Sequence, residues 1–506
     1  MNLSLRSIRL ILFDKKGVKI FEDWLPVRTT INGLHVEQDP KEWWQLLKEL
    51  LGNLSQKKEI VKNITTLTVT SSAQCLVVIN DDGDPIDKVF MVSDKRAADE
   101  ADEIRQYLLQ ISELNAHKVD ASYLLPKILW LKKHKRSVFR RAKRFLSAND
   151  YLLFKLTGKY VTDIFNAEKC YYDRNSRSYP KKLLKKLGLS SSYFPKVVDP
   201  GTGIGNVQKG VVGMFPFLSQ TKVFVGTYDA LCALIGSSTH EEGELNNVCG
   251  TCSSYRVFTH KKSVFSPKLL EQEFVSEKLR IIGGSNNLEG GVLEWAKECY
   301  YSDVYPKDDA LLYSLIEREA TESSLGANGL LFIPYLIGER LPISDIYVRG
   351  MFFGMERFHS RKDIIRSIFE ANAFQAKMMV DEFEKSGIEI AKINMSGGVA
   401  KLSLAAQIRA DVLGIPVHVV KEVETTALGA YILCQKGRGK LASIKEGSKL
   451  IAIEKKYIPN MHNHNCYASL FMLYKELYET NASLFKKRHE ILKSVMHYQK
   501  KVLENL

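Results

Sequence analysis

The chain has 506 residues, of which 45% are hydrophobic and 26% are charged, ordinary values for a soluble globular protein of roughly two to four domains. No apolar stretch approaches the roughly 18 residues that a membrane-spanning helix needs, and the apolar run at residues 10–13 is too short for the core of a signal peptide. The composition excludes a membrane-embedded protein, and we expect a cytoplasmic one.

The chain is basic, because 72 Lys and Arg residues outnumber 58 Asp and Glu residues and give a net charge of +14. The densest basic cluster lies at residues 132–144, where apolar residues recur at helical spacing. This pattern predicts one solvated helix face. Because no zinc-finger spacing or aromatic RNA-binding motif accompanies the charge, we expect no nucleic-acid partner.

In chain order, the first half begins with a predicted hairpin of strands at residues 9–14 and 18–21. A helix is predicted over residues 39–51, with Asp39 as the N-cap and Pro40 at the first helical position. A buried strand at residues 65–69 follows, and helices with leucine periodicity are predicted for much of 97–190.

The second half repeats this order. A strand at residues 222–225 leads through a short turn into a helix at 230–235, and another hairpin opens at Asn246. Ser360 and Asp363 form a capping-box pattern at the start of a helix over 361–386. A strand at 393–395 then enters a Gly-Gly turn. Two copies of a strand-hairpin-helix unit, more than 200 residues apart, predict an α/β protein with two similar halves.

Eight cysteines are scattered along the chain, and only Cys249 and Cys252 have a CxxC spacing. A zinc site would need a second pair or nearby histidines, and a redox motif would open a helix. The residues that follow, 253–258, are typical of a strand. We therefore interpret the pair as reduced thiols in a hairpin.

Three glycine-containing turns could bring backbone amides close to a phosphate, a role that glycine permits. They lie at residues 250–251, 283–291 and 397–398. Asp229 follows a strand end, where a carboxylate could accept a proton from a substrate hydroxyl. Its position alone favours a helix N-cap. On their own, these residue patterns predict only a glycine-rich α/β protein that could bind phosphate.

Longer segments resemble a known family. Residues 329–354 contain PYLIGER and RGMFFG, and residues 396–417 read SGGVAKLSLAAQIRADVLGIPV. These two segments are similar to the signatures of FGGY-family carbohydrate kinases, of the xylulokinase-like and gluconate kinase-like kind. From about residue 7 to 480, further matches follow in the family's order at residues 35–44, 93–98, 150–158, 226–229, 249–252 and 424–430.

The resemblance implies two actin-like (ribonuclease H-like) ATPase domains that flank a deep cleft. The N-terminal domain, residues 1–245, would hold the substrate. The C-terminal domain, residues 246–506, would hold the nucleotide, with the last helix packing back. The implied function is ATP-dependent phosphorylation, with Mg²⁺, of a hydroxyl of a small sugar, ketose, polyol or sugar acid. The implied partners are this sugar and ATP, and a homodimer stays open.

The family's site residues can be placed on this chain by its motifs. Asp229 would be the base and would contact the substrate, together with Ala73, Gln74 and Asp94, although Asp94 could instead only pair with Arg96. No protein ligand is assigned to a metal. The implied ATP-binding residues are Gly250, Thr251, Gly290, Gly397, Gly398 and Val399. Ala73 and Gln74 replace the Met-His of xylulokinases, so D-xylulose is not assumed as the substrate.

The chain departs from the family at its start. Residues 2–7, NLSLRS, stand where the family has D-x-G-T-[TS]-S as its first phosphate loop. Asn2 lacks a carboxylate charge, and Ser4 lacks the conformational freedom of glycine. The alternative to an active kinase is therefore a catalytically impaired, sugar-kinase-like binding or regulatory protein.

Overall fold

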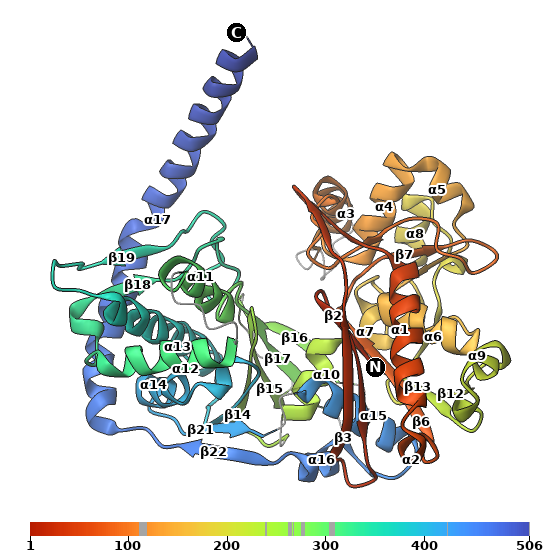
Figure 1. The fold of residues 1–506 in the computed structure, drawn as a ribbon. Helices are drawn as coiled ribbons and strands as arrows, with labels where there is room; N and C mark the ends of the chain where they lie inside the picture. Colours follow the sequence, from red (N-terminus) through yellow and green to blue (C-terminus); the bar gives the residue numbers. More distant parts are fainter. Residues whose placement is uncertain are drawn as a thin grey trace. The chain divides into compact units, whose positions relative to one another are not determined.

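The computed structural model describes residues 1–110, 119–237, 240–261, 266, 268–274, 279–302, 309–421 and 424–504. The chain forms two compact units (Figure 1). Unit 1 comprises Met1–Gly236 and Thr425–Leu450, and unit 2 comprises Ser237–Glu424 and Ile451–Leu506. Across these described ranges, no helix combines the length and apolar character that a bilayer crossing requires.

Unit 1 is built on a six-stranded mixed sheet. In spatial order the strands are β12 (Gly203–Asn206), β13 (Lys222–Val225), β6 (Thr66–Ser71), β1 (Asn2–Leu3), β2 (Ser7–Phe13) and β3 (Lys19–Pro26). Strands β1, β2 and β3 form an antiparallel meander. Strand β6 then pairs in parallel with β1, and β13 pairs in parallel with β6. The predicted hairpin and both predicted strands are present.

Helices and shorter strands complete unit 1. The helices are α1 (Pro40–Ser55), α2 (Lys58–Val61), α3 (Ala98–Gln110), α4 (Leu124–His134), α5 (Arg136–Arg141), α6 (Ala148–Thr157), α7 (Ile164–Glu168), α8 (Lys181–Leu187), α9 (Lys209–Met214), α10 (Asp229–Ser237), α15 (Thr425–Gly437) and α16 (Ile444–Gly447). The shorter strands are β4 (Thr30–Asn32), β5 (His35–Gln38), β7 (Val77–Ile79), β8 (Val89–Phe90), β9 (Arg144–Leu146), β10 (Val161–Asp163) and β11 (Lys196–Val198).

Unit 2 repeats the topology of unit 1. Its sheet runs β16 (Leu270–Glu273), β17 (Arg280–Ser285), β15 (Ser253–Thr259), β14 (Glu244–Cys249), β20 (Lys392–Ser396), β21 (Val417–Val420) and β22 (Ile453–Tyr457). Strands β14, β15 and β17 form the antiparallel meander, and β20 and β21 continue it in parallel. The predicted α/β class and its repeated unit are therefore confirmed.

The helices of unit 2 are α11 (Gly290–Tyr300), α12 (Asp309–Glu322), α13 (Arg361–Lys385), α14 (Ser403–Leu413) and α17 (Met461–Glu504), and a small sheet joins β18 (Leu331–Ile333) to β19 (Met351–Phe353).

Local sequence signals explain where the clearest helices begin and end. The Asp39 side chain accepts a hydrogen bond from the Lys41 amide, as an N-cap does. Ser360 and Asp363 form the predicted capping box of α13, and Gly387 follows this helix with a φ of +76°. These caps satisfy backbone groups that a helix end otherwise leaves without partners.

The two units differ from the division predicted after residue 245. That position lies inside β14, and residues 425–450 return to unit 1. The return follows from a close helix contact, since a Cβ on Gly429 of α15 would lie 1.8 Å from the Cys232 carbonyl oxygen of α10. Only glycine permits such an approach.

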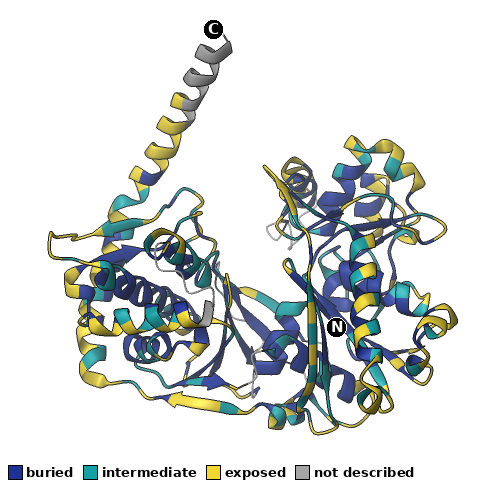
Figure 2. Ribbon diagram, in the orientation of Figure 1, coloured by how far each residue is buried: buried dark blue, intermediate teal, exposed yellow. Residues whose placement is uncertain are grey.

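The last helix packs on unit 2 through its first half. Tyr467, Phe471 and Tyr474 are buried in that unit's core, and the Tyr467 hydroxyl donates to Glu370 over 2.8 Å. Phe485 is still buried in that core, whereas from Lys486 on the described residues of α17 are exposed, as Figure 2 shows.

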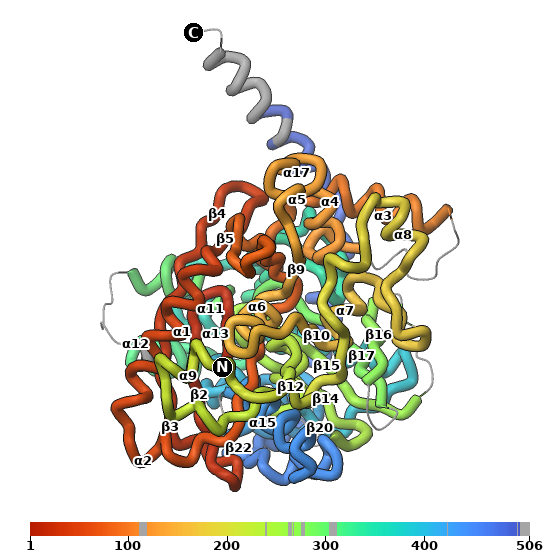
Figure 3. The backbone as a smooth tube through the Cα atoms, turned by 90° about the vertical axis from the view of Figure 1, so that its right-hand side faces the viewer, coloured from red at the N-terminus to blue at the C-terminus, as the bar shows by residue number. Residues whose placement is uncertain are grey.

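Helices α3, α4, α5 and α8 gather in one part of unit 1 (Figures 1 and 3). They share a hydrophobic cluster that is separate from the cluster on the main sheet and that includes Ile104, Ile128 and Leu184.

Candidate functional site

Asp229 lies where the chain leaves β13 and starts α10. The Tyr228 carbonyl accepts the amides of Leu231 and Cys232 over 3.2 and 3.0 Å, so Tyr228 takes the N-cap position and Asp229 is the first helical residue. The carboxylate is half-buried and accepts hydrogen bonds from the Ser72 hydroxyl (3.2 Å) and the Ala230 amide (2.7 Å). Asp229 is therefore not the N-cap that its sequence position favours.

The loop before Asp229 is fixed by a hydrogen bond to the buried side chain of Asp163. The Thr227 hydroxyl donates to Asp163 over 2.8 Å, and Asn166 donates to the same carboxylate over 2.7 Å. Burial raises the pKa of Asp163 above its usual range, and burial raises the pKa of neighbouring Asp150 to about 7. A Cβ on Gly226 would lie 2.3 Å from the Val69 carbonyl oxygen, so this loop is pressed against β6.

Ala73 and Gln74 lie in the loop after β6. Ala73 is half-buried beside Ser72, whose hydroxyl connects this loop to Asp229. Gln74 is buried and has a φ of +59°, and its side-chain oxygen accepts the Leu124 amide over 2.9 Å. The structure thus joins the loop that carries Ala73 to Asp229 through Ser72, whereas the Gln74 side chain fixes this loop to α4.

Asp94 is fully buried. Its carboxylate pairs with the Arg96 guanidinium at 2.7 Å and accepts the Val36 amide at 2.7 Å. The structure therefore shows Asp94 paired with Arg96, which is the second of the two roles that the sequence left open.

Lys127 is a residue that the sequence analysis missed. It lies on α4 with its side chain fully buried, and its ammonium donates to the carbonyl oxygens of Gln74 (2.8 Å) and Met91 (2.6 Å). Burial lowers the pKa of Lys127 to about 8, although Cys75 and Asp94 act against this shift. Lys127 therefore positions the loop that carries Ser72 and Ala73. A lysine on an apolar helix gives no sign of this role in the sequence.

We expect Lys127 to make stability depend on pH between about 8 and 10.5. In this window the unfolded chain binds more protons than the folded chain, so the free energy of unfolding rises with pH, by up to about 3 kcal/mol in total. Lys127→Met should lack the rise. Urea unfolding at pH 7.5 and 9.5 should therefore show that the free energy of unfolding rises more with pH in the wild type than in Lys127→Met. The exposed Lys182→Met is the control and should behave like the wild type, and equal gains in all three proteins would contradict the assignment.

In unit 2, the Gly250 turn joins β14 to β15 and rests on the start of α11. The amides of Gly290 and Gly291 donate to the carbonyl oxygens of Gly250 (3.0 Å) and Thr251 (3.1 Å). A Cβ on Gly290 would lie 2.5 Å from the Gly250 oxygen. The structure therefore brings Gly250, Thr251 and Gly290 together, and Gly250 and Thr251 remain exposed.

The Gly-Gly turn after β20 reaches the same place. Gly397 has a φ of +92°, and a Cβ on it would lie 2.4 Å from the Cys249 oxygen. Gly398 is exposed with open space where a Cβ would stand, while the Val399 side chain is buried next to Gly290. The six predicted nucleotide-side residues thus form one cluster, in which Gly250, Thr251 and Gly398 are exposed.

A buried ion pair supports this cluster. Arg409 of α14 donates to Glu289 over 2.5 Å, and the Tyr255 hydroxyl donates to the other oxygen of Glu289 over 3.0 Å. Burial opposes the charge of Arg409, but Glu289 raises its pKa above the ordinary value. Arg409 also contacts the thiol of Cys249, over 3.1 Å. Arg409 lies in the segment 396–417 that resembles the family signature, and Glu289 lies in the glycine-containing turn at 283–291, yet the sequence gives no sign that the two residues pair.

The predicted hairpin around the cysteine pair is present. Cys249 is buried at the end of β14, Cys252 is exposed in the turn, and both are free thiols. Across the described part of the chain, no group of three or more histidine, cysteine or acidic side chains could hold a metal ion.

The N-terminal loop is a tight turn between β1 and β2. The Ser4 amide donates to the Ser7 oxygen over 2.9 Å, and the Ser4 hydroxyl accepts the amides of Ser7 (3.2 Å) and Arg6 (3.4 Å). Gln38 donates to the Leu5 oxygen over 2.8 Å. The serine that replaces glycine thus stabilises the turn through its own hydroxyl.

Comparison with known proteins covers nearly the whole chain. The chain is 25% identical to a xylulose kinase of Staphylococcus epidermidis, over 96% of this chain and 97% of that protein. It is 26% identical to a glycerol kinase of Thermococcus kodakarensis, over 90% and 91%. Among solved structures, a gluconate kinase and a ligand-bound xylulose kinase of Lactobacillus acidophilus superpose with TM-scores of 0.84 and 0.83, at 24% and 23% identity, over 96% of this chain and 98% of each neighbour.

These superpositions confirm the predicted two-domain fold. The FGGY carbohydrate kinase N-terminal domain matches residues 5–236, and the C-terminal domain of the same family matches residues 245–436. The chain therefore belongs to the FGGY family of carbohydrate kinases.

Proposed function

We propose that this carbohydrate kinase transfers the terminal phosphoryl group of ATP to a hydroxyl of a small sugar, ketose, polyol or sugar acid. Asp229 serves as the base that accepts the hydroxyl proton. The observation that carries the proposal is the setting of Asp229. Its carboxylate stands at the start of α10, on a loop fixed through Thr227 to Asp163, and contacts Ser72 of the Ala73 loop. A positioned carboxylate suits phosphoryl transfer, in which positioning and charge neutralisation do most of the work.

The nucleotide would bind to the glycine cluster of unit 2. Gly398 leaves room for a phosphate or ribose to approach the backbone, and the exposed Thr251 adds a hydroxyl. Mg²⁺ fits this arrangement because it usually keeps several waters and binds through substrate phosphates with one or two carboxylates, so it needs no protein cage. Bound with the nucleotide, Mg²⁺ would neutralise charge on the phosphates.

The substrate class is set by the loop of Ser72 and Ala73. Ala73 presents only a methyl group, and Gln74 is turned inward to α4. The relatives are named for xylulose, glycerol and gluconate, which share adjacent hydroxyl groups. We propose a substrate of this size and kind, and we do not assign D-xylulose in particular.

The direct test is ADP formation by the unmodified full-length chain with Mg-ATP and a panel of D-xylulose, glycerol, D-gluconate and related ketoses and polyols. At least one compound should stimulate ADP formation well above the rate without sugar. Nothing in the comparisons favours the catalytically impaired alternative. A folded protein that binds ATP but responds to no member of the panel would contradict the proposal and support that alternative.

Gly398→Ala tests the nucleotide site separately. Gly398 has helical backbone angles (φ −60°, ψ −44°) and open space around it, so alanine should change the free energy of unfolding by less than about 0.5 kcal/mol. If the nucleotide approaches this backbone, the added methyl group should raise the KM for ATP by about tenfold, equal to ~1.4 kcal/mol. The KM for the sugar should not change.

Gly213→Ala is the matched control, because Gly213 of α9 also has open space where its Cβ would stand. It should leave both KM values unchanged. A Gly398→Ala enzyme with wild-type KM for ATP would remove Gly398 from the nucleotide site.

A further inference from the structure

The basic segment at residues 132–144 does not form the single solvated helix face predicted from its sequence. Helix α4 ends at His134, and Lys135 has φ −124° and ψ 56°, which are not helical angles. A second short helix, α5, then begins at Arg136. Because the helix is broken here, basic side chains of α4 and of α5 line the same pocket instead of lying along one face of a single helix.

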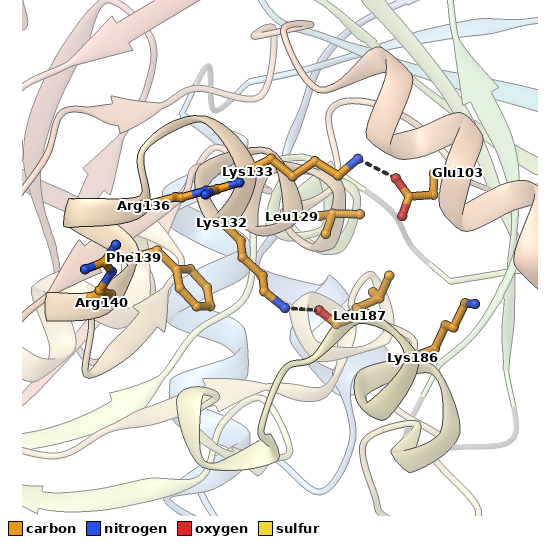
Figure 4. A pocket seen from close by; sticks show the side chains of 9 residues that line it. All are labelled: Glu103, Leu129, Lys132, Lys133, Arg136, Phe139, Arg140, Lys186 and Leu187. Carbon is orange, nitrogen blue, oxygen red and sulfur yellow. Dashed lines mark hydrogen bonds and ion pairs between the residues drawn. The ribbon is translucent and has the colours of Figure 1, made fainter.

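These cations line a pocket of about 470 Å³ in unit 1 (Figure 4). Five of its lining side chains are cationic and one, Glu103, is acidic, which leaves a formal excess of four positive charges, five minus one. The cations are Lys132, Lys133, Arg136 and Arg140 of α4 and α5, and Lys186 of α8. None of the residues placed beside Asp229 lines this pocket.

Two of the lysines are engaged in the fold. Lys132 donates to the carbonyl oxygens of Leu187 (2.6 Å) and Gly188 (3.0 Å), and so ties α4 to the end of α8. Lys133 pairs with Glu103 and lies 3.4 Å from Glu100. These contacts hold the walls of the pocket in place.

The two arginines are different. Arg136 and Arg140 are both exposed at the rim of the pocket, and within the described ranges neither guanidinium group has a hydrogen bond or an ion pair with the protein. They are four residues apart on α5, a spacing that puts two like charges on one helix face and destabilises the helix. An anion between them would relieve this repulsion, and guanidinium groups bind phosphate oxygens in a two-pronged geometry.

The remaining wall is apolar. Phe139 is half-buried, and its ring is held by Phe145 and Tyr193, with centroids 5.9 and 5.8 Å away. Leu129 and Leu187 are buried beside it. A fixed aromatic ring next to two arginines suits a ligand with an anionic end and a carbon-rich ring. The volume falls in the range of small-molecule sites, about 300–1,000 Å³.

We propose that this pocket binds a small organic phosphate, with its phosphate group on Arg136 and Arg140 and its ring against Phe139. The site is separate from the residues around Asp229, and the proposal does not depend on the proposed kinase reaction. It also gives a role to a part of the basic charge that the kinase function does not use.

The test is calorimetric titration of the full-length chain with AMP, ribose 5-phosphate, inorganic phosphate and adenosine. The double variant Arg136→Gln/Arg140→Gln should weaken one binding event of an organic phosphate by at least about tenfold. Lys181→Gln/Lys182→Gln, which removes two exposed cations of α8 outside the pocket, should leave it unchanged. Binding at the nucleotide cluster of unit 2 should be the same in all three proteins, which separates the two sites.

Two further arms define the ligand. Phe139→Leu keeps every charge and should weaken the binding of AMP or ribose 5-phosphate more than the binding of inorganic phosphate. Whichever of the two organic phosphates binds the wild type more tightly indicates the kind of ring that packs against Phe139. Equal affinity for organic phosphates in the wild type and the arginine variant, with both folded by circular dichroism, would overturn the proposal. So would binding of a single-stranded oligonucleotide that both double variants weaken equally, since this would show a diffuse basic surface instead of a pocket.

Discussion

Asp229→Asn is expected to lower the turnover of sugar phosphorylation by about 10²–10⁴-fold, the usual contribution of a general base. Asparagine keeps the size and the hydrogen-bonding capacity of the side chain, so the contact with the Ser72 hydroxyl can remain. What is lost is the negative charge that accepts the proton. The KM values for sugar and ATP should therefore change little, and the loss should be in kcat.

The competing explanation is that Asp229 only stabilises the start of α10. Asp99→Asn is the matched control, because Asp99 is an exposed aspartate in the first turn of α3. Both variants should change the free energy of unfolding by less than about 1 kcal/mol. Steady-state assays on the substrate from the panel, with melting curves of each protein, decide between the roles. Turnover of Asp229→Asn within a few-fold of the wild type would exclude the base assignment.

The second large effect is expected for Arg409→Met. Removing this guanidinium leaves Glu289 charged and buried without its main partner, which typically costs about 3–5 kcal/mol of unfolding free energy. Because Glu289 immediately precedes α11 and the Gly250 turn rests on that helix, the KM for ATP should also rise in the protein that remains folded. Urea unfolding and ATP-dependent kinetics measure the two effects.

The double variant Arg409→Met/Glu289→Met should recover much of the lost stability, since replacing both buried charges by apolar groups is often nearly neutral. Lys62→Met provides the matched control for an exposed pair, because Lys62 and Glu59 lie at 2.7 Å with largely exposed side chains. Its cost should be below about 1 kcal/mol. If Arg409→Met is no more costly than Lys62→Met, the buried pair does not support the cluster.

The sequence alone was enough to determine the local elements and the family. The Asp39 cap and the capping box at Ser360 depend on contacts between residues close in the chain, so their patterns predict them directly. The strand before Asp229 pairs with the distant strand β6, so its apolar run predicts a buried strand but not the partner of that strand. The family motifs identified the glycine turns and Asp229. The family models, which match both halves of the chain, then confirmed the resemblance.

Other features were decided by the tertiary structure alone. Lys127 reads as an ordinary lysine until α4 packs against the Gln74 loop, and Arg409 meets Glu289 across 120 residues of chain. The Lys135 break likewise turns an apparent surface helix into two walls of a pocket. The physical reason is that burial and charge pairing depend on which segments pack together, and segments far apart in the chain carry no local pattern that specifies their partners.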